Sequence, residues 1–387
     1  MLPAAISAYA EAMSVVGNPA SIHSQGQNAK RMLEEAREAV AASVNCDPIE
    51  VVFTGGGTES VNLAIKGLWW ARNPRRRILV PGGEHHATMD TVEWLERHEG
   101  AEVQWIPLDT LGRIDLDALR RAIESDPDSV ALVTLLAANN EVGTIQPIAE
   151  VAALASAHGI PVHVDAISAY GHVPIDFAAL SSQGVSALSI SAHKIGGPVG
   201  IGALVLSRTA TVVPLIHGGG QQRQVRSGTQ DVAAAVSFAV AASAAIEAMP
   251  TETVRLAALR DRLVDGVLAS VPAAVLNGDP DPSGRIASNA HFTFTGCEGD
   301  SLLFLLDASG VSVSTGSACQ AGIPEPSHVL QAMGRSEVEA RGALRITLGR
   351  TSTEADVDAF LAALPAAYAQ ASKAGLADRL PGTGAYT

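Results

Sequence analysis

The side chains most able to do chemistry in this sequence stand beside apolar runs, and a lysine is the most conspicuous of them. Lys194 follows the run 187–190 and precedes a glycine-rich stretch at 195–202, where small residues permit close approach of the backbone. A desolvated lysine can lose its proton and form a Schiff base with a carbonyl compound. The alternative is a lysine whose ammonium group reaches solvent, which is the commoner state.

An aspartate and a histidine extend this chemistry. Asp165 ends an apolar run in which only His163 is polar. A carboxylate there needs a cationic partner, such as a protonated pyridine nitrogen, although capping a helix is an alternative use. His85 could stack on an aromatic ring or carry protons, whereas most histidines are simply hydrogen-bonded.

A glycine-rich turn predicts an anion site. Gly55, Gly56 and Gly57 precede Thr58 and a helical run at 61–66. Backbone amides at the start of a helix suit a phosphate group. The lysine of a nucleotide P-loop is missing after these glycines, so that kind of site is excluded. A plain tight turn remains the alternative.

One thiol stands in an accessible context. Cys319 lies between the run 311–314 and a stretch at 322–326 that carries glycine and prolines, which predicts an exposed, mobile loop bearing a reactive cysteine. Cys46 and Cys297 are interpreted as inert. Three scattered cysteines do not match a metal site, and an odd number fits a reducing compartment.

Short runs rich in valine and isoleucine alternate with helical stretches up to about residue 206. This alternation predicts a mainly parallel sheet with helices on its faces. The predicted strands are 51–53, 77–80, 102–107, 130–136, 161–164, 187–190 and 201–206. The carboxyl ends of parallel strands share one edge of the sheet, so the polar segments that follow them should converge on one crevice.

Those polar segments form a recognisable set. They are 54–60, 84–86, 139–141, Asp165 and 191–194. A phosphate turn, an imidazole, a carboxylate and a lysine on one edge predict a pyridoxal phosphate site. This cofactor needs a charged ring nitrogen to withdraw electrons and a lysine to hold its aldehyde.

The chain is expected to form two domains, a large α/β domain over 1–250 and a smaller α+β domain over 251–387. For the second domain we predict a helix at 255–267 and strands at 290–294, 311–314 and 343–348. The apolar run 232–246 is interpreted as a buried helix, because it is shorter than the ~20 residues that span a bilayer.

Composition narrows the class of protein. The chain is 47% hydrophobic and 17% charged, which is typical of a globular protein. Lys+Arg 26 against Asp+Glu 40 gives a net charge of −14, so nucleic acid is not expected as a partner. Residues 1–16 show no basic start before an apolar run, so we expect a cytoplasmic protein that is not bound to a membrane.

A series of segments resembles the cysteine desulfurases of the NifS/IscS type, which belong to the class V aminotransferase family of fold-type I pyridoxal phosphate enzymes. In chain order they are GNPAS (17–21), TGGGTES (54–60), EHH (84–86), NNEVG (139–143), HVDA (163–166), SAHK (191–194), RSGT (226–229) and SAC (317–319). The resemblance implies the fold of a fold-type I transferase. Its large domain has a mainly parallel seven-stranded sheet, and its smaller C-terminal α+β domain carries the catalytic cysteine loop.

The resemblance also implies catalytic roles. Lys194 would hold the cofactor covalently and then move the substrate's proton, and Asp165 would hold the pyridine nitrogen. His85 would stack on the ring and help to move protons. Cys319 would take the substrate sulfur as a persulfide, on a loop of the kind found in the long-loop branch of the family.

Binding roles follow from the same resemblance. The cofactor would be held by Gly57, Thr58, Asn140, Ser168, Ser191, Ala192, His193 and, in a homodimer, the partner subunit's Thr229. Arg345 would bind the substrate carboxylate, with Asn18 and Asn140 nearby. Ser168 stands where the family usually has a glutamine. Because serine is shorter, we expect its contact with the ring hydroxyl to be missing or water-mediated.

The implied reaction converts L-cysteine to L-alanine. A sulfur-acceptor protein, such as an iron–sulfur scaffold, would receive the sulfur for cluster assembly or tRNA thiolation. Selenocysteine lyase or class V aminotransferase activity is an alternative, although transamination has no use for Cys319. A non-catalytic scaffold for sulfur-transfer partners is a further alternative, and such a protein need hold no cofactor.

Overall fold

The structure is a computed structural model that describes residues 1–316 and 326–377, and these divide into two compact units. Unit 1 comprises 1–106, 114–138 and 146–250, and unit 2 comprises 107–113, 139–145 and the chain from 251 onward. We had placed 107–113 and 139–145 in the first domain. The second segment groups with unit 2 because Ile145 N donates to Gly284 O (2.9 Å) and Ile286 N donates to Gly143 O (2.9 Å). The first segment is bonded to the second, since Thr144 Oγ1 donates to Leu111 O (2.6 Å).

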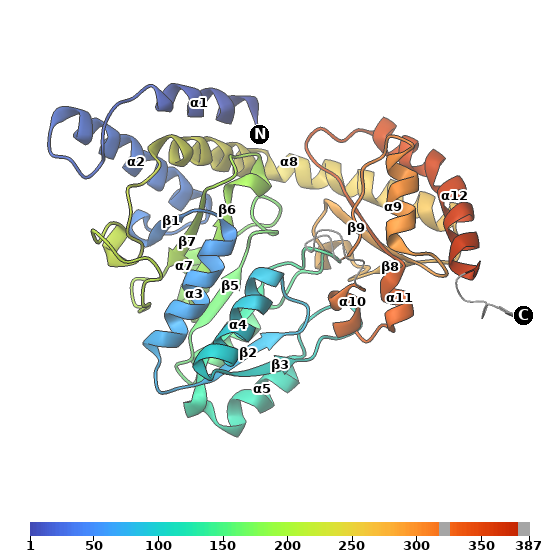
Figure 1. The fold of residues 1–387 in the computed structure, drawn as a ribbon, viewed down its shortest axis with the longest axis horizontal. Coiled ribbons are helices and arrows are strands. Elements are labelled where there is room, and N and C mark those ends of the chain that lie inside the picture. Colours follow the sequence, from blue (N-terminus) through green and yellow to red (C-terminus); the bar gives the residue numbers. More distant parts are fainter. Residues whose placement is uncertain (317–325, 378–387) are drawn as a thin grey trace, which may run out of the picture. The chain divides into compact units, whose positions relative to one another are not determined.

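Unit 1 is built on a seven-stranded sheet (Figure 1). Its strands are β1 (Val51–Thr54), β2 (Arg77–Pro81), β3 (Glu102–Ile106), β4 (Val130–Leu136), β5 (Val162–Asp165), β6 (Val185–Ser191) and β7 (Gly202–Leu206), in the spatial order β1-β7-β6-β5-β4-β2-β3. Only β7 runs antiparallel to its neighbours. The predicted strands and the mainly parallel sheet are therefore confirmed.

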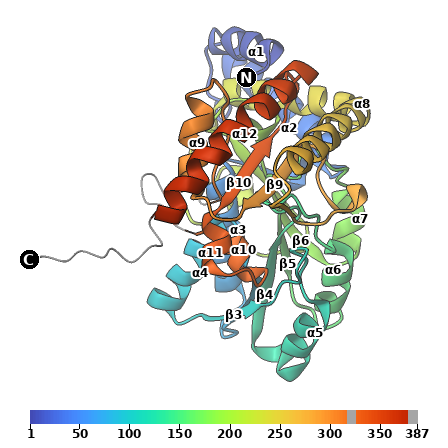
Figure 2. The ribbon, with the colours of Figure 1, turned by 90° about the vertical axis from the view of Figure 1, so that its right-hand side faces the viewer.

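Helices cover both faces of this sheet, as Figure 2 shows. One face carries α3 (Gly57–Ala71) and α4 (His86–Glu99), and the other carries α5 (Leu116–Ser125), α6 (Ile148–Ser156) and α7 (Phe177–Ser182). Every residue of β4 is buried, as expected for an interior strand of a sheet covered on both faces. The unit also contains α1 (Pro3–Met13) and α2 (Ser24–Ser43).

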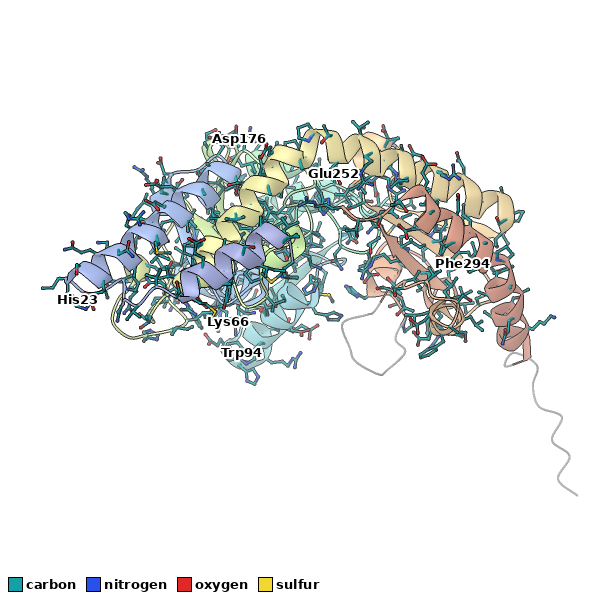
Figure 3. The ribbon with its side chains drawn as sticks, turned by 90° about the horizontal axis from the view of Figure 1, so that it is seen from above. His23, Lys66, Trp94, Asp176, Glu252 and Phe294 are labelled. Atoms are coloured by element: carbon teal, nitrogen blue, oxygen red, sulfur yellow. The ribbon has the colours of Figure 1, made fainter. Side chains whose placement is uncertain are left out.

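Helix α8 (Val232–Ser270) is longer than the apolar run from which we predicted it. It continues through Pro250, and the apolar residues beyond the proline that keep it packed include Leu259 and Leu263, both buried. Glu252, labelled in Figure 3, accepts hydrogen bonds from Arg255 just after the proline.

This greater length changes one sequence argument. Among the described residues, α8 is the one helix long and apolar enough to cross a bilayer by length and composition alone, so our exclusion on grounds of shortness was wrong. The burial of α8 is the observation that bears on whether it crosses a membrane, and 44% of its most apolar window is buried inside the protein.

Unit 2 contains an antiparallel sheet in the order β10-β9-β8, formed by β8 (Ala274–Asn277), β9 (Asn289–Phe294) and β10 (Ala343–Thr347). Its helices are α9 (Gly299–Asp307), α10 (His328–Ala332), α11 (Glu337–Arg341) and α12 (Glu354–Ala377), and its core centres on Phe292 and Phe294. The predicted strand at 311–314 is wrong, since only Ser314 pairs, with Arg345. Strand β8 was not predicted. Two of its four residues are not buried, so it lacks the continuous apolar run that marked β1 and β5.

An aromatic cluster ties α8 to the sheet of unit 1. The Phe238 ring meets Phe53 and Tyr170 edge to face, with centroids 6.4 and 6.3 Å apart, and is fully buried. Such geometry adds to the free energy gained by burying the rings.

We expect Phe238→Ala to lower the free energy of unfolding by about 3–5 kcal/mol, because it leaves a cavity between α8 and the sheet. Val16→Ala is the control, since Val16 is 80% exposed and its truncation should change stability little. Denaturant titration of both variants checks this. A loss for Phe238→Ala no larger than that for Val16→Ala would contradict the packing described.

Candidate functional site

The carboxyl ends of β1, β2, β4, β5 and β6 lie along one edge of the sheet in unit 1, because these strands run in one direction. Backbone contacts tie the ends together. Leu136 N donates to Glu84 Oε1 (3.1 Å), and Ala137 N donates to Asp165 O (2.7 Å). The segments 54–60, 84–86, Asp165 and 191–194 therefore converge as predicted. The segment 139–141 belongs to unit 2.

Asp165 is the buried acid of this edge, with 1% of its surface exposed. Its Oδ1 accepts a hydrogen bond from Ile167 N (2.9 Å). Burial raises the pKa of this carboxyl to about 6, although the Ile167 bond and the positive charge of Lys194 oppose the rise. A buried carboxylate that remains hard to ionise gains from a further cation. It therefore fits the protonated pyridine nitrogen of pyridoxal phosphate.

Lys194 lies in the 3₁₀ turn η3 (Ala192–Ile195), directly after β6. We expected it to be buried, but its side chain is exposed. The reason is local, since 196–202 is rich in glycine and offers few side chains to cover it. Its charge nevertheless acts on Asp165, and it adds to burial, the larger cause, in lowering the pKa of both His172 and His193. The amine and the acid are thus brought together at this edge.

The glycine-rich turn packs too tightly for side chains. A Cβ on Gly57 would lie 2.3 Å from Ile167 Cδ1 and 3.5 Å from Ser191 Cβ, and Gly56 has a φ of 147°. Gly57 opens α3, so its backbone stands at a helix start between the ends of β5 and β6. This cradle, which a Cβ would fill, fits a phosphate group.

The remaining predicted phosphate ligands surround that turn. Thr58 is exposed, Ser191 and Ala192 are buried, and His193 is exposed. Ser191 Oγ and His193 Nδ1 are 2.8 Å apart. Their hydroxyl and imidazole groups are suitable donors for an anion, and their assignment to phosphate stays a prediction.

His85 caps α4. Its Nδ1 accepts a hydrogen bond from Ala87 N (3.0 Å), so the neutral ring carries its proton on Nε2. The predicted roles of His85 in stacking on the ring and in proton transfer stay predictions. The same bond fixes the tautomer that a proton-transfer role would use.

Three further predicted residues of unit 1 lie in loops or turns. Ser168 Oγ donates to Ala138 O (2.5 Å), so its proton is engaged at the end of β4. Asn18 is exposed, and its Oδ1 accepts from Ala20 N (2.9 Å). Thr229 is exposed. Their binding roles stay predictions.

Sequence reasoning missed a polar network beneath the acid. His163, two residues before Asp165 on β5, bonds through Nδ1 to Thr134 Oγ1 (2.8 Å) and through Nε2 to Ser189 Oγ (2.9 Å). Ser60 of α3 donates to Ser189 Oγ (2.9 Å). Burial lowers the pKa of His163 to about 3, so the ring is neutral. One polar residue in an apolar run was the available signal.

Unit 2 holds the predicted carboxylate-binding arginine. Arg345 on β10 is half-buried, and its Nη1 donates to Asn140 O (2.9 Å). Asn140 Oδ1 is buried, with no hydrogen-bond partner among the described residues. The preceding Asn139 shapes this turn, because its Oδ1 accepts from Glu141 N (2.9 Å) and Val142 N (3.0 Å). The substrate-binding roles of Asn140 and Arg345 stay predictions.

Glu141 is a buried carboxyl to which sequence reasoning gave no role. It is 2% exposed and accepts a hydrogen bond from Ser327 Oγ (2.6 Å). Burial raises its pKa to about 7, while the Ser327 bond and the charge of Arg345 act against the rise. Its signal in the sequence was only its place in the NNEVG segment.

The cysteines divide as follows. Cys319 lies outside the described residues, so its loop and role stay predictions. Burial, with nearby acidic charges, raises the pKa of Cys46 to about 12 and that of Cys297 to about 11. Thiols with such pKa values are poor nucleophiles, which agrees with the inert interpretation. Within 1–316 and 326–377, no group of three or more His, Cys, Asp or Glu side chains is placed to hold a metal ion.

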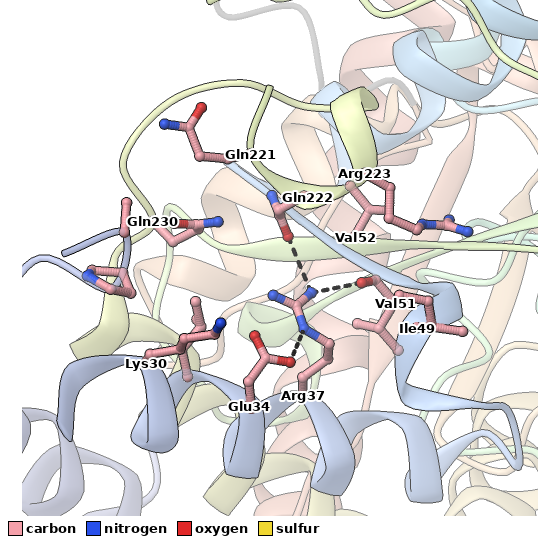
Figure 4. A pocket seen from close by; sticks show the side chains of 13 residues that line it. Lys30, Glu34, Arg37, Ile49, Val51, Val52, Gln221, Gln222, Arg223 and Gln230 are labelled. Atoms are coloured by element: carbon pink, nitrogen blue, oxygen red, sulfur yellow. Dashed lines mark hydrogen bonds and ion pairs between the residues drawn. The ribbon is translucent and has the colours of Figure 1, made fainter. Parts of the chain in front are cut away.

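A cavity of about 490 Å³ lies elsewhere on unit 1, against α2 and β1 (Figure 4). Arg37 is central to it and donates to Val51 O (2.7 Å) and Gln222 Oε1 (3.2 Å). None of the predicted site residues in the described part of the chain lines this cavity.

The buried carboxyl of Glu141 predicts a pH dependence. Its pKa rises from 4.5 to about 7 on folding, so the native state binds the proton more tightly. Stability should fall as pH rises through this range, by about 3 kcal/mol for this group. Glu141→Gln should therefore match the wild type near pH 4.5 and exceed it in stability near pH 8. Denaturant titration at both pH values checks this, and a difference independent of pH would contradict it.

Comparisons with known proteins agree with this geometry. The family model described as aminotransferase class-V matches residues 2–360. An IscS-like cysteine desulfurase of Mycobacterium tuberculosis is 55% identical over 97% of this chain and 96% of its own length.

Solved structures agree as well. A NifS-like protein superposes with a TM-score of 0.86 at 33% identity, covering 96% of both chains. SspA, solved in complex with cysteine, superposes with a TM-score of 0.77 at 32% identity, covering 90% of this chain and 95% of its own. The chain therefore belongs to the class V aminotransferase family and, within it, to the cysteine desulfurases of the IscS and NifS type, which are fold-type I enzymes that use pyridoxal phosphate.

Proposed function

We propose that this chain converts L-cysteine to L-alanine and transfers the substrate sulfur to Cys319. The observation that carries the proposal is the buried Asp165 carboxyl, on which the charge of Lys194 acts, at the edge where the glycine cradle opens. The 55% identity to an IscS-like cysteine desulfurase and the likeness to a protein solved with cysteine support L-cysteine as the substrate.

The residues of unit 1 would hold pyridoxal phosphate at three points. Gly57 and its neighbours supply amides for the phosphate, Asp165 accepts the proton on the ring nitrogen, and Lys194 binds the aldehyde carbon. When bound, the cofactor withdraws electrons from the Cα of the amino acid. Asp165 must remain an anion for this to work, and a pyridinium beside it would lower its pKa again.

Lys194 and His85 would handle protons. Lys194 Nζ would take the Cα proton of the substrate and later return a proton to the product. Lys194 follows β6 directly in the η3 turn, and its side chain is exposed. His85, with its proton held on Nε2 by the Ala87 bond, would donate or accept at that atom.

The sulfur step is a thiol substitution. The Cys319 thiolate attacks the substrate Sγ, a sulfur–sulfur bond forms, and the carbon–sulfur bond breaks with its electron pair remaining on the carbon fragment. That fragment takes up a proton and leaves as alanine. In total, L-cysteine and an enzyme thiol become L-alanine and an enzyme persulfide, so atoms and electrons balance.

Arg345 would bind the carboxylate of L-cysteine. A guanidinium is permanently charged and planar, and it can bind a carboxylate through two parallel hydrogen bonds. One of its amino groups is already held by Asn140 O, which fixes the plane of the group. Asn18 and Asn140 would complete the substrate site.

Further parts of the proposal concern the location, the oligomeric state and the partner of the enzyme. We infer that the enzyme is a cytoplasmic homodimer in which the partner subunit's Thr229 completes the phosphate site. We also infer that a sulfur-acceptor protein, such as an iron–sulfur scaffold, takes the persulfide sulfur. The similarity to cysteine desulfurases of the IscS type supports these inferences.

The experiment that tests the proposal compares two variants. Lys194→Ala should lose the visible absorbance of the covalently held cofactor, because no amine remains to bind the aldehyde. Cys319→Ser should keep that absorbance while release of sulfide and alanine from L-cysteine collapses. The visible spectrum and the product assays check both. Retained turnover in Cys319→Ser would rule out the persulfide route.

Asp165→Asn should weaken cofactor binding about 10- to 100-fold. The variant replaces a charge-assisted hydrogen bond, worth about 1.5–3 kcal/mol, by a neutral one. Asp128→Asn is the matched control, since that side chain is 93% exposed. Titration of the apoenzyme with pyridoxal phosphate measures both affinities. Equal affinity in the two variants would contradict the role of Asp165.

A further inference from the structure

We propose that Glu141 is a positioning residue for sulfur transfer, because its buried carboxyl bonds Ser327 and lies against Gly316, the two described flanks of the segment that carries Cys319. This inference rests on the proposed function, since the position of the flanks matters to catalysis only if Cys319 receives the sulfur. All of the residues involved belong to unit 2.

The C-terminal flank is held by a hydrogen bond with a defined direction. Ser327 Oγ donates to Glu141 Oε2 (2.6 Å) and accepts from Leu330 N (3.2 Å), by which it caps α10. Because Leu330 N donates to a lone pair of the serine oxygen, the serine O–H is directed toward Glu141 Oε2, which accepts it. Glu141 therefore sets both the place of Ser327 and the start of α10.

The N-terminal flank comes to the same carboxylate. A Cβ on Gly316 would lie 3.0 Å from Glu141 Oε2 and 2.6 Å from Ser327 Cβ, so the backbone runs directly past this contact. Two residues earlier, Ser314 exchanges two backbone hydrogen bonds with Arg345 (3.0 and 2.7 Å). The chain thus pairs with β10 at Ser314 and passes Glu141 at Gly316, just before residue 317.

Glu141 is itself fixed. Asn139 Oδ1 accepts from Glu141 N (2.9 Å), and Asn289 Nδ2 donates to Glu141 O (2.9 Å). Hydrogen bonds therefore hold the backbone of Glu141 at both its N–H and its carbonyl group. Burying a carboxyl is costly, and an apolar residue of similar size would often be at least as stable. A role outside stability explains why a carboxyl stands here.

The experiment uses the holoenzyme and four variants. Glu141→Ala removes the acceptor, Glu141→Gln keeps an acceptor oxygen, and Ser327→Ala removes the donor. Ser336→Ala is the matched control, because Ser336 caps the equally short helix α11 without touching Glu141. For each we would measure cofactor content, the spectral Kd for L-cysteine, and kcat for alanine release with persulfide on Cys319.

Glu141→Ala and Ser327→Ala should lower kcat by roughly 10- to 100-fold, the effect of a small displacement of a reacting group. Cofactor content and the Kd for L-cysteine should stay within about 2-fold of wild type, a range of ~0.4 kcal/mol. Glu141→Gln should restore most of kcat, and Ser336→Ala should keep it. Should Glu141→Ala fail to fold, Glu141→Gln and Ser327→Ala still decide the question.

Several results would overturn the inference. One is full kcat in Glu141→Ala or in Ser327→Ala, when Cys319→Ser has lost its turnover. A weakened Kd for L-cysteine with unchanged kcat in Glu141→Ala would show that Glu141 acts on substrate binding, through Arg345, and not on sulfur transfer. An equal loss of kcat in Ser336→Ala would show that the loss of a helix cap by itself explains the effect of Ser327→Ala. Full turnover in Cys319→Ser would instead contradict the proposed function itself, and this inference with it.

Discussion

The interaction on which the site depends is the burial of one negative charge. Asp165 ends β5 with 1% of its surface exposed, and burial alone would drive its carboxyl toward the neutral form. One backbone amide and the charge of Lys194 oppose that tendency, and its pKa still stays near 6. The positive charge of a pyridinium would add to these two effects and favour the ionised carboxylate. The acid and the cofactor therefore stabilise each other's charged forms, and this mutual need links the fold to the chemistry.

The sheet supplies the geometry for that balance. Parallel strands bring Asp165, the η3 turn with Lys194 and the start of α3 to one edge, so residues about 140 positions apart meet without long loops. The neutral His163 network behind Asp165 joins β4, β5, β6 and α3 through side-chain bonds. Such a network holds the backbone of β5 in place and adds no charge of its own near the acid.

Much of unit 1 could be predicted from sequence, because its strands are apolar runs bounded by turns and because Lys194, Asp165 and Gly57 belong to motifs with chemical meaning. The exposure of Lys194 could not, since it depends on which side chains cover η3. The continuation of α8 through Pro250 depends on packing beyond the proline. The pairing of 143–145 with 284–286, which takes 139–145 into unit 2, is a tertiary contact. The roles of Glu141 and His163 could not be assigned from their weak sequence signals, because their partners are distant in sequence.

The most direct measurement of the central claim is the protonation state of the cofactor's ring nitrogen in the holoenzyme, read from the ¹⁵N chemical shift of labelled pyridoxal phosphate across neutral pH. The account predicts a protonated nitrogen throughout in the wild type and loss of that proton in Asp165→Asn. An unprotonated nitrogen in the wild type, or a signal unchanged by the substitution, would contradict it.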